Sequence, residues 1–369
     1  MNKFKKIVFI VDSLSQPRCI KRILSFANNG YECCVYGYDR SRYSCNVFPP
    51  CIKVTVLGEM RDGTDYLKKF IQLMKDIKRI IHENKKDSPI YYSFGFISTL
   101  IFFLRRQKYI YEISDILYGY PRFSRILWLL KKVDKRVINN SIVTVMTSEG
   151  FYDFFSIKKE NIVILPNKIN STLAQYKRTR LQMQRTSKIV FSFVGSIRYD
   201  TVFRFAEVIG EKFPQHEFLF YGRAKGKVLD KCNYLISTYT NIKYLGEYKN
   251  PEDLPNIYDN INVVVACYTP SSLNERIAEP NKLYEALFFC RPIIVSQGIF
   301  LEHQVNKYKC GFSIDATSKE KICEFIEDLN YIKINSISNN NWNIKTEDLI
   351  DNPDVLLKKV DDYLNSLQK

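Results

Sequence analysis

The sequence predicts an α/β protein made of two doubly wound domains that face a central cleft. Short apolar runs of strand length alternate with amphipathic segments of helix length along nearly the whole chain, the order from which helix-covered parallel sheets are built. A polar, basic stretch without periodicity at 168–187 interrupts this alternation, which then starts again. The length of 369 residues suits two domains, and 46% hydrophobic residues can fill their cores. A cleft between two such domains is the natural place for a ligand.

The first domain is expected at 1–167. Its expected strands lie at 6–12, 31–38, 53–57, 89–94, 109–113, 142–146 and 162–165. Helices are expected at 18–28, 66–84, 94–106 and 122–139, with a further one starting near Phe151. No G-x-G-x-x-G follows the first strand, which argues against a dinucleotide site and a dehydrogenase.

The stretch 168–187 is expected to be a linker, and 188–345 the second domain. Expected strands there lie at 189–195, 216–222, 242–245, 261–267, 292–296 and 310–314. The end of the chain, 346–369, carries a helix with apolar positions on one side, which is expected to pack back on the first domain.

The segment 278–296 predicts a loop, a helix and a buried strand. Pro280 suits the first helical turn, whose free backbone N–H groups, with Lys282 beside them, form an anion site. Glu285 lies one turn further and can accept two vicinal hydroxyls, as ribose offers. A phosphate and a ribose indicate a nucleotide. The alternative interpretation is an ordinary amphipathic helix that starts with proline.

Several expected strands of the second domain end in glycine with polar neighbours. These ends are Gly195-Ser196-Ile197-Arg198, Gly222-Arg223 and Gly246-Glu247-Tyr248. Glycine lets a ligand approach the backbone closely. Arg198 and Lys282 can then neutralise a diphosphate. In the first domain, Glu112 and Asp115 close a strand and are candidate cleft carboxylates; alternatively, Asp115 caps the following helix.

The formal charge of +16 calls for an anionic partner. The helices expected at 66–84 and 122–139 combine basic and apolar residues, which favours an anionic membrane surface; alternatively, they cover the sheet with a solvated basic face. The apolar run 94–104 is too short to span a bilayer. The ten cysteines lack metal-type spacing and, with no visible signal peptide at the start, favour a cytoplasmic protein that is peripheral to the membrane.

The chain resembles GT-B glycosyltransferases over nearly its whole length, most closely those of glycosyltransferase family 4. The resemblance rests on the segments 9–15, 111–115, 163–167, 193–195 and 220–222, and above all on Pro-Asn-Lys-Leu-Tyr-Glu-Ala at 280–286. It implies two Rossmann-like domains, with a nucleotide-sugar donor on the second and the acceptor on the first. It also implies transfer of a hexose with retention at the anomeric carbon and without a metal or cofactor; consistently, the sequence contains no Asp-x-Asp.

The resemblance also assigns residues to roles. Glu285 would hold the ribose hydroxyls, Arg198 and Lys282 the diphosphate, and Asp115 would face the acceptor, so that Asp115, Arg198 and Lys282 form the catalytic set. The full donor-side set is Gly195, Ser196, Arg198, Gly222, Arg223, Tyr248, Glu279, Asn281, Lys282, Leu283 and Glu285. The acceptor-side set is Ser15, Gln16, Glu112 and Asp115.

The sequence departs from the family pattern at three places. The earlier motif glutamate falls on Ile277, and Glu275 or Glu279 is a candidate to replace it. The lysine usual after the Arg198 position is missing, and the loop after the first strand has Ser15-Gln16 where paired glycines are usual.

The resulting function is a glycosyltransferase that builds a bacterial surface polysaccharide, such as capsule or O-antigen, on a lipid-linked acceptor. A sugar-nucleotide epimerase or a phosphorylase on the same fold is the alternative within enzymes. Epimerases usually need more cleft histidines than the three present here. A nucleic-acid-binding protein is the alternative from another class, but no recognisable motif accompanies the charge, so no nucleic-acid partner is expected.

Overall fold

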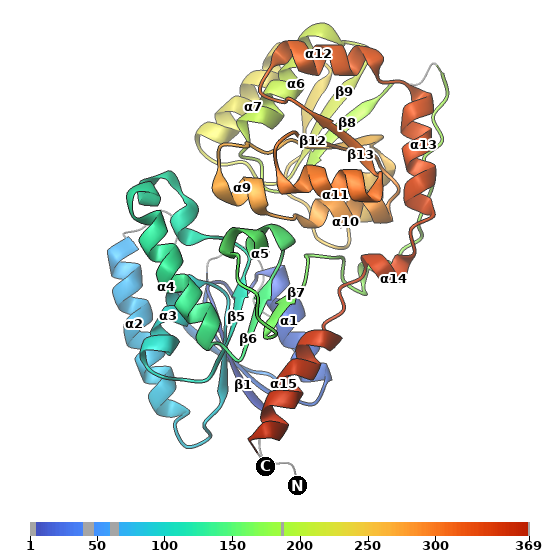
Figure 1. Ribbon diagram of the computed structural model, residues 1–369. Coiled ribbons are helices and arrows are strands. Elements are labelled where there is room, and N and C mark those ends of the chain that lie inside the picture. Colours follow the sequence, from blue (N-terminus) through green and yellow to red (C-terminus); the bar gives the residue numbers. More distant parts are fainter. Residues whose placement is uncertain (1–4, 40–47, 60–65, 186–187, 368–369) are drawn as a thin grey trace. The chain divides into compact units, whose positions relative to one another are not determined.

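The computed structural model describes residues 5–39, 48–59, 66–185 and 188–367. The chain divides into two compact units, Met1–Pro166 with Asn352–Lys369, and Asn167–Asp351 (Figure 1). Each unit is a parallel β-sheet covered by helices, as the sequence predicts. Residues 1–4, on which the expectation about a signal peptide rests, lie outside the described ranges.

The first unit contains a seven-stranded sheet in the order β3-β2-β1-β4-β5-β6-β7. Its strands are β1 (Lys6–Val11), β2 (Glu32–Asp39), β3 (Lys53–Glu59), β4 (Ile90–Ser93), β5 (Tyr109–Ile113), β6 (Val143–Met146) and β7 (Ile162–Ile164). All neighbouring pairs are parallel. The strands are almost entirely buried except β3, because helices cover both faces of the central strands.

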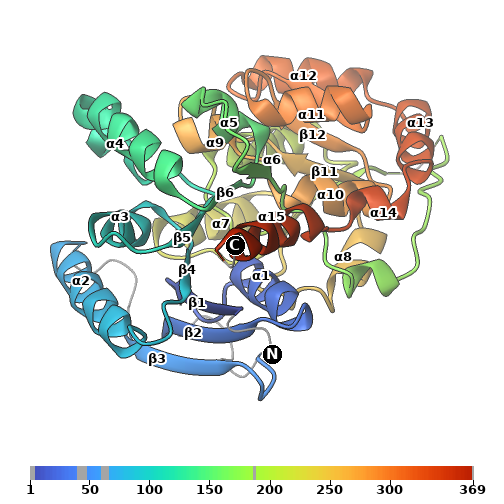
Figure 2. The same ribbon diagram turned by 60° about the horizontal axis from the view of Figure 1, so that its bottom comes forward.

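Helices lie on both faces of this sheet, and α3 packs between α2 and α4 on one of them (Figure 2). The helical elements are α1 (Pro17–Asn28), α2 (Tyr66–Glu83), α3 (Phe96–Leu104), the 3₁₀ turns η1 (Leu117–Gly119) and η2 (Pro121–Ile126), α4 (Leu127–Asn140), α5 (Glu149–Phe155) and α15 (Asp354–Ser366). The C-terminal helix α15 belongs to this unit, where Asp361 accepts a hydrogen bond from the hydroxyl of Tyr31 at 2.7 Å. No helix of the described ranges is both long and apolar enough to cross a membrane.

The helix predicted at 122–139 is shorter than expected. Its first turn is the 3₁₀ segment η2, which Pro121 opens, and the α-helix begins only at Leu127. A buried aspartate, Asp134, anchors α4 to the sheet: its carboxylate accepts hydrogen bonds from the hydroxyls of Tyr118 at 2.8 Å and Tyr111 at 3.5 Å. Burial raises the pKa of Asp134 to about 7, and the two tyrosine hydroxyls only partly offset this rise.

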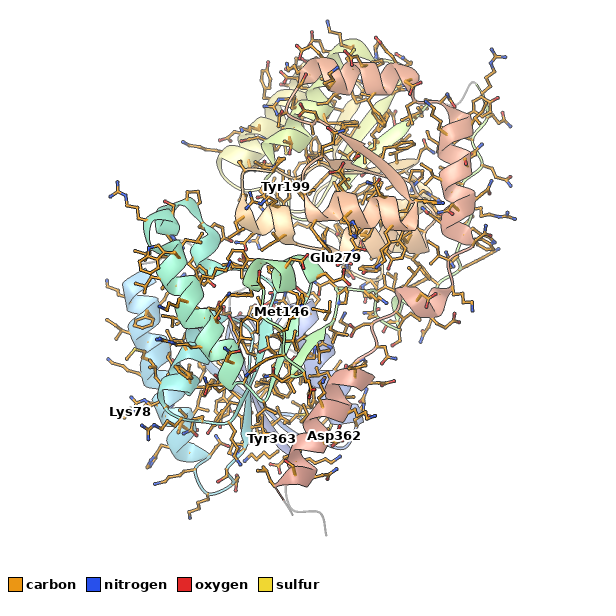
Figure 3. The ribbon with its side chains drawn as sticks, in the orientation of Figure 1. Lys78, Met146, Tyr199, Glu279, Asp362 and Tyr363 are labelled. Atoms are coloured by element: carbon orange, nitrogen blue, oxygen red, sulfur yellow. The ribbon has the colours of Figure 1, made fainter. Side chains whose placement is uncertain are left out.

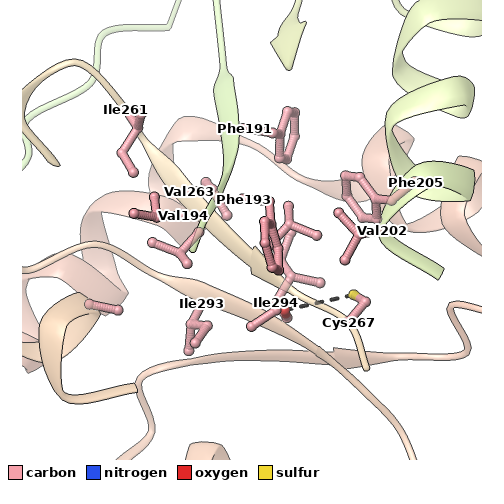
Figure 4. Close-up of a cluster of buried hydrophobic side chains, with 14 of the residues drawn as sticks. Phe191, Phe193, Val194, Val202, Phe205, Ile261, Val263, Cys267, Ile293 and Ile294 are labelled. Carbon is pink, nitrogen blue, oxygen red and sulfur yellow. Dashed lines mark hydrogen bonds between the residues drawn. The ribbon is translucent and has the colours of Figure 1, made fainter. Parts of the chain in front are cut away.

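The second unit contains a six-stranded parallel sheet in the order β10-β9-β8-β11-β12-β13. Its strands are β8 (Val190–Val194), β9 (Glu217–Tyr221), β10 (Ile242–Tyr244), β11 (Val263–Ala266), β12 (Ile293–Ser296) and β13 (Gly311–Ile314). Its helical elements are η3 (Leu173–Gln175), α6 (Asp200–Lys212), α7 (Lys227–Thr238), α8 (Leu254–Asp259), α9 (Leu273–Ile277), α10 (Asn281–Phe288), α11 (Phe300–Tyr308), α12 (Lys319–Asp328), α13 (Tyr331–Trp342) and α14 (Thr346–Leu349). The core lies between the strands and these helices; Figure 4 shows Phe191 and Phe193 of β8 beside Phe205 of α6.

The segment predicted as a linker, 168–187, lies within the second unit, except for 186–187, which fall outside the described residues. Ile169, Leu173 and Met183 are buried in its core. The guanidinium of Arg178 donates to the carbonyl oxygens of Phe288 at 3.0 Å and Asn341 at 2.7 Å. Apart from the short turn η3, the segment lacks periodicity because it packs along other elements of the unit.

We expect the contribution of Asp134 to the stability of the first unit to fall as pH rises from about 4 to 7. The folded state keeps a proton on Asp134 up to about pH 7, whereas the unfolded chain releases it near 3.8, so the folded state binds more protons in that window. Asp134→Asn keeps an acceptor for Tyr118 but cannot ionise. The variant should therefore gain stability relative to the wild type at pH 8, on the order of 1.4 kcal/mol per unit of pKa shift, and much less at pH 5. Chemical denaturation at the two pH values measures this, and an equal difference at both would contradict the assignment.

Candidate functional site

The candidate site lies where the strand order of the second unit's sheet reverses, which is its topological switch point. From β8 the chain builds outward through β9 to β10, and then returns to the other side of β8 to add β11, β12 and β13. Ligands of open α/β sheets bind at the carboxyl ends of the strands at such a switch point. The residues there are Gly195, directly after β8, and Cys267 and Tyr268, directly after β11.

Two glycines shape the backbone at this edge. Gly195 has φ of +133°, and a Cβ there would lie 2.7 Å from the Lys282 Nζ. Gly222 follows β9 with φ of +131°, and a Cβ there would lie 1.8 Å from the carbonyl oxygen of Gly195. The Gly222 N–H in turn donates to the carbonyl of Gly246 at 2.6 Å. The three glycine strand ends singled out in the sequence are therefore neighbours, and the first two must be glycine.

Lys282 points into this edge from the first turn of α10. Its side chain is only 8% exposed, and its Nζ lies 4.6 Å from the ring centre of Phe193 and 3.3 Å from the hydroxyl oxygen of Tyr268. Among the described residues, no carboxylate forms an ion pair with this ammonium group; Glu285 acts on it only through space. Burial therefore lowers the pKa of Lys282 to about 8, with Glu285 opposing and Arg198 adding to the decrease.

Glu285 lies three residues further along α10, on the same side of the helix as Lys282. Its carboxylate is 3% exposed; Oε2 accepts from the Tyr258 hydroxyl at 3.0 Å and Oε1 from the Asn281 side-chain amide at 2.7 Å. Burial raises the pKa of Glu285, while Lys282 and these donors, with Asn250, lower it in part. Leu283, Ala286 and Leu287, on the other side of α10, are in the hydrophobic core, which fixes the helix against the sheet.

Arg198 is exposed beside the same edge. Its guanidinium lies 5.0 Å from the ring centre of Tyr199, and that ring packs against Tyr268 at 4.5 Å between centres. Tyr199 is labelled in Figure 3. Arg198 acts electrostatically on Lys282 and on Glu275. Two cations thus share the switch point, and each makes the other's charge less favourable until an anion is present.

The remaining donor-side candidates divide into two groups. Ser196 is exposed next to Gly195, Tyr248 is half-buried and acts electrostatically on Tyr258, and Arg223 forms an ion pair with Glu247 at 3.5 Å. Two other candidates point away from the edge. The Leu283 side chain is fully buried in the core, so only its backbone is available to a ligand. Glu279 is buried and accepts a hydrogen bond from the Tyr284 hydroxyl.

The first motif position has two candidate replacements, and the structure places them differently. Glu275 is half-buried in α9; its Oε2 accepts from the Thr269 N–H at 3.0 Å, and it lies within the electrostatic reach of Arg198. Burial raises the pKa of Glu275. Glu279, by contrast, interacts with Tyr284 and acts on Tyr308. Of the two, Glu275 is the one on which Arg198 is shown to act.

The acceptor-side candidates lie in the first unit. Ser15 and Gln16 follow β1, and the Ser15 hydroxyl is 3.0 Å from that of Ser13. Asp115 follows β5 at the same carboxyl edge, is exposed, and accepts from the Tyr120 hydroxyl at 2.9 Å. The N-cap position of the next helical turn is Ile116.

Glu112 is not at that edge. Its side chain is fully buried, with the Arg22 Nε at 3.0 Å and the Arg18 Nε at 3.4 Å. Tyr92 donates a short hydrogen bond to the same carboxylate, and the arginines hold the pKa of Glu112 below its usual value despite burial. This network joins α1 to β4 and β5 inside the first unit. The expectation of a cleft carboxylate at Glu112 did not allow for the helices that cover both faces of the sheet, so that every residue of β5 is buried.

Comparison with known proteins shows the fold. No family model matches the chain, and no curated protein sequence is significantly similar to it. Among solved structures, it is similar to sucrose-phosphate synthase from Thermosynechococcus elongatus, with 13% identity over 99% of this chain and 100% of that one and a TM-score of 0.73. It is also similar to HepE from Anabaena in complex with UDP-glucose, with 15% identity over 98% and 99% of the two chains and a TM-score of 0.66.

A third similar structure is a putative UDP-N-acetylglucosamine 2-epimerase from Listeria monocytogenes, with 13% identity over 92% of this chain and 91% of that one and a TM-score of 0.62. These similarities confirm the predicted GT-B fold. At such identities they concern the fold alone.

Sequence analysis missed the two tyrosines that complete the site. Tyr268 is fourteen residues before Lys282 and Tyr258 twenty-seven before Glu285, so no local spacing links them. The available signal was their position beside the apolar strand β11 at 263–266, Tyr258 before it and Tyr268 after it. Most residues of that strand are β-branched, whereas these two neighbours are aromatic.

We expect Lys282→Met to stabilise the second unit while abolishing its affinity for pyrophosphate. The folded state depresses the pKa of Lys282 from 10.5 to about 8, so below about pH 8 folding carries the unfavourable burial of a charged ammonium, which vanishes as pH rises above 10.5. Methionine fits among Phe193 and Tyr268 without charge. At pH 7 the variant should melt higher than the wild type without ligand and should not respond to pyrophosphate. A lower melting point together with an unchanged pyrophosphate response would contradict the anion site.

Proposed function

We propose that the protein is a glycosyltransferase that moves a sugar from a nucleotide-sugar donor to a saccharide acceptor. The observation that carries this proposal is the buried ammonium of Lys282 at the switch point of a doubly wound sheet. Within the described part of the chain, it has aromatic and hydroxyl neighbours but forms no ion pair with a carboxylate. A buried charge without a partner is unfavourable, and a bound diphosphate would supply the missing anion. The complex of HepE with UDP-glucose, a chain of the same fold, supports this class of donor.

The site residues would then act as follows. Lys282, Arg198 and the N-terminus of α10, whose N-cap Pro280 offers no side-chain cap, would stabilise the negative charge that grows on the leaving diphosphate. Glu285 would accept the ribose hydroxyls. The backbone at Gly195 and Gly222 would allow the phosphates to approach closely.

The reaction needs no protein nucleophile. The acceptor hydroxyl oxygen bonds to the anomeric carbon as the bond from that carbon to the diphosphate oxygen breaks, and the hydroxyl proton passes to the departing phosphate. Transfer would then retain the anomeric configuration. Asp115, exposed at the carboxyl edge of the first unit, would orient the acceptor, together with Ser15 and Gln16.

We further propose that the donor sugar is a hexose and that the acceptor is a lipid-linked saccharide of a bacterial surface polysaccharide. The support is the resemblance of the Pro280–Ala286 segment to transferases of that type. The putative epimerase of the same fold favours one alternative, a sugar-nucleotide epimerase. An epimerase would change the sugar of a donor with no acceptor present, and a phosphorylase would release a sugar phosphate, so product analysis separates the three.

The transfer reaction is expected to proceed without a divalent metal. Purified protein is first screened by thermal shift against UDP-, GDP-, ADP- and dTDP-sugars, because a true donor raises the melting temperature by mass action. Transfer from the best donor is then measured in excess EDTA. Because the cations at the switch point neutralise the leaving diphosphate, turnover should persist, whereas Lys282→Ala should lower it by about 10²–10³. Loss of turnover in EDTA that Mg²⁺ or Mn²⁺ alone restores would overturn the leaving-group assignment.

We also propose that the protein attaches to the cytoplasmic face of an anionic membrane through the first unit. Ile126, Trp128 and Leu129, at the start of α4, are 44%, 67% and 45% exposed. Basic residues surround them at Arg122, Arg125, Lys131, Lys132, Lys135 and Arg136. On α2, Phe70, Ile71 and Met74 are also exposed. Apolar side chains beside lysines and arginines suit the boundary between headgroups and acyl chains.

Vesicle flotation tests this attachment. Binding should be strong with vesicles that contain phosphatidylserine and weak with phosphatidylcholine alone, because each basic residue near an anionic surface contributes about 1 kcal/mol. Trp128→Ser should weaken it without changing the fold, since most of that side chain is exposed. Trp342→Ser, at a tryptophan of the second unit that is 39% exposed, is the matched control. Equal flotation with both lipids would remove the electrostatic explanation.

A further inference from the structure

Tyr258 holds Glu285 from outside the segment that the sequence marks as functional. The two residues come from different helices, α8 and α10, and both are buried. The hydroxyl of Tyr258 donates to Oε2 of Glu285 at 3.0 Å, while the amide of Asn281 donates to Oε1 at 2.7 Å. Each carboxylate oxygen therefore has a fixed donor, and both donors are neutral.

Tyr258 is itself rigid. Its ring stacks on that of Phe289, with 4.6 Å between ring centres and 18° between planes. Its carbonyl oxygen accepts from the Nε of Arg291 at 2.7 Å, and the same guanidinium donates to the carbonyl of Phe289 at 2.6 Å. The Tyr258 backbone and the end of α10 are thus tied to one arginine, while the stack on Phe289 restrains the ring that carries the hydroxyl.

The carboxylate nevertheless keeps acceptor capacity toward the surface. An ionised carboxylate offers about four acceptor sites, and the Tyr258 and Asn281 bonds occupy one on each oxygen; Asn250 interacts with it as well. Asn250 and Asn281 are both exposed, so the group lies directly beneath the surface next to Lys282. It can accept a hydroxyl donor from a ligand whose phosphates reach that lysine.

We propose that Tyr258 is a positioning residue that makes Glu285 a rigid acceptor for the ribose 2′-hydroxyl, so that the protein selects ribonucleotides over 2′-deoxyribonucleotides. This rests on the proposed function, because it concerns the donor nucleotide of that site. A 2′-deoxyribose would displace water from the buried carboxylate but has no 2′-hydroxyl to donate a hydrogen bond in its place. A buried acceptor left without a donor weakens binding by roughly ten- to a hundredfold.

The test compares dissociation constants by isothermal titration calorimetry. Wild-type protein is titrated with UDP, GDP and ADP, and with the 2′-deoxy counterpart of the tightest of the three. We expect the ribonucleotide to bind about tenfold or more tightly than its deoxy form. In Tyr258→Phe this ratio should fall toward one through weaker ribonucleotide binding, while affinity for pyrophosphate, which Lys282 governs, stays within about twofold.

The matched control is Tyr284→Phe. Tyr284 is another buried tyrosine whose hydroxyl donates to a carboxylate, that of Glu279, from α10 itself. A loss of stability alone would affect both variants alike, and only the Tyr258 variant should change the ribose preference. Asn281→Ala, at an exposed residue, removes the second donor and should lower the ratio in the same way, even if Tyr258→Phe does not fold.

Three results would overturn the proposal. The first is equal affinity of the wild type for the ribonucleotide and its 2′-deoxy form. The second is an unchanged ratio of these two affinities in the folded Tyr258 and Asn281 variants, and the third is an equal drop of that ratio in Tyr284→Phe. If none of the nucleotides binds the wild type, the proposed function fails as well, and the two failures are thereby distinguished.

Discussion

The second unit is organised around one unfavourable group, the buried ammonium of Lys282. Its place requires that Gly195 have no side chain, because a Cβ would lie 2.7 Å from Nζ. Gly195 in turn requires Gly222, since a Cβ there would meet the Gly195 carbonyl oxygen at 1.8 Å. Both residues also have positive φ angles, which glycine adopts without strain. The two glycine positions therefore depend on where one lysine lies.

Other buried ionisable groups of this protein differ from Lys282 in the partners that compensate their charge. The charge of Glu112 is paired with those of Arg18 and Arg22, and its carboxylate accepts a hydrogen bond from Tyr92. Asp134 has tyrosine donors, and its pKa is raised to about 7, so that it can remain neutral. Lys282 has a single hydroxyl neighbour, and its pKa of about 8 still leaves it mostly charged at neutral pH. This difference supports the proposal that the ammonium binds an external anion.

The sequence was sufficient for features that depend on local pattern. Strands buried on both faces are continuous apolar runs, and the alternation with helices predicted two doubly wound units. The helix after Pro280, with Lys282 and Glu285 on one side, follows from helical periodicity. Contacts between distant segments were not accessible: Arg22 reaches Glu112 across 90 residues, and Arg178 reaches Phe288 across 110. The burial of Leu283 and Glu279 was not accessible either, because a motif does not say which of its side chains turn inward.

The two charged residues of α10 have different kinds of neighbours, and this difference indicates that they have separate roles. Glu285 has neutral donors on both carboxylate oxygens, so its geometry is fixed before any ligand arrives. Lys282 is surrounded by ring faces and one phenol, which favour a cation without fixing its hydrogen-bond directions. A rigid acceptor suits hydroxyls at defined positions, whereas a freely directed ammonium suits a diphosphate whose charge shifts as a bond breaks. Recognition would thus depend on Glu285 and the response to developing charge on Lys282, one helical turn apart.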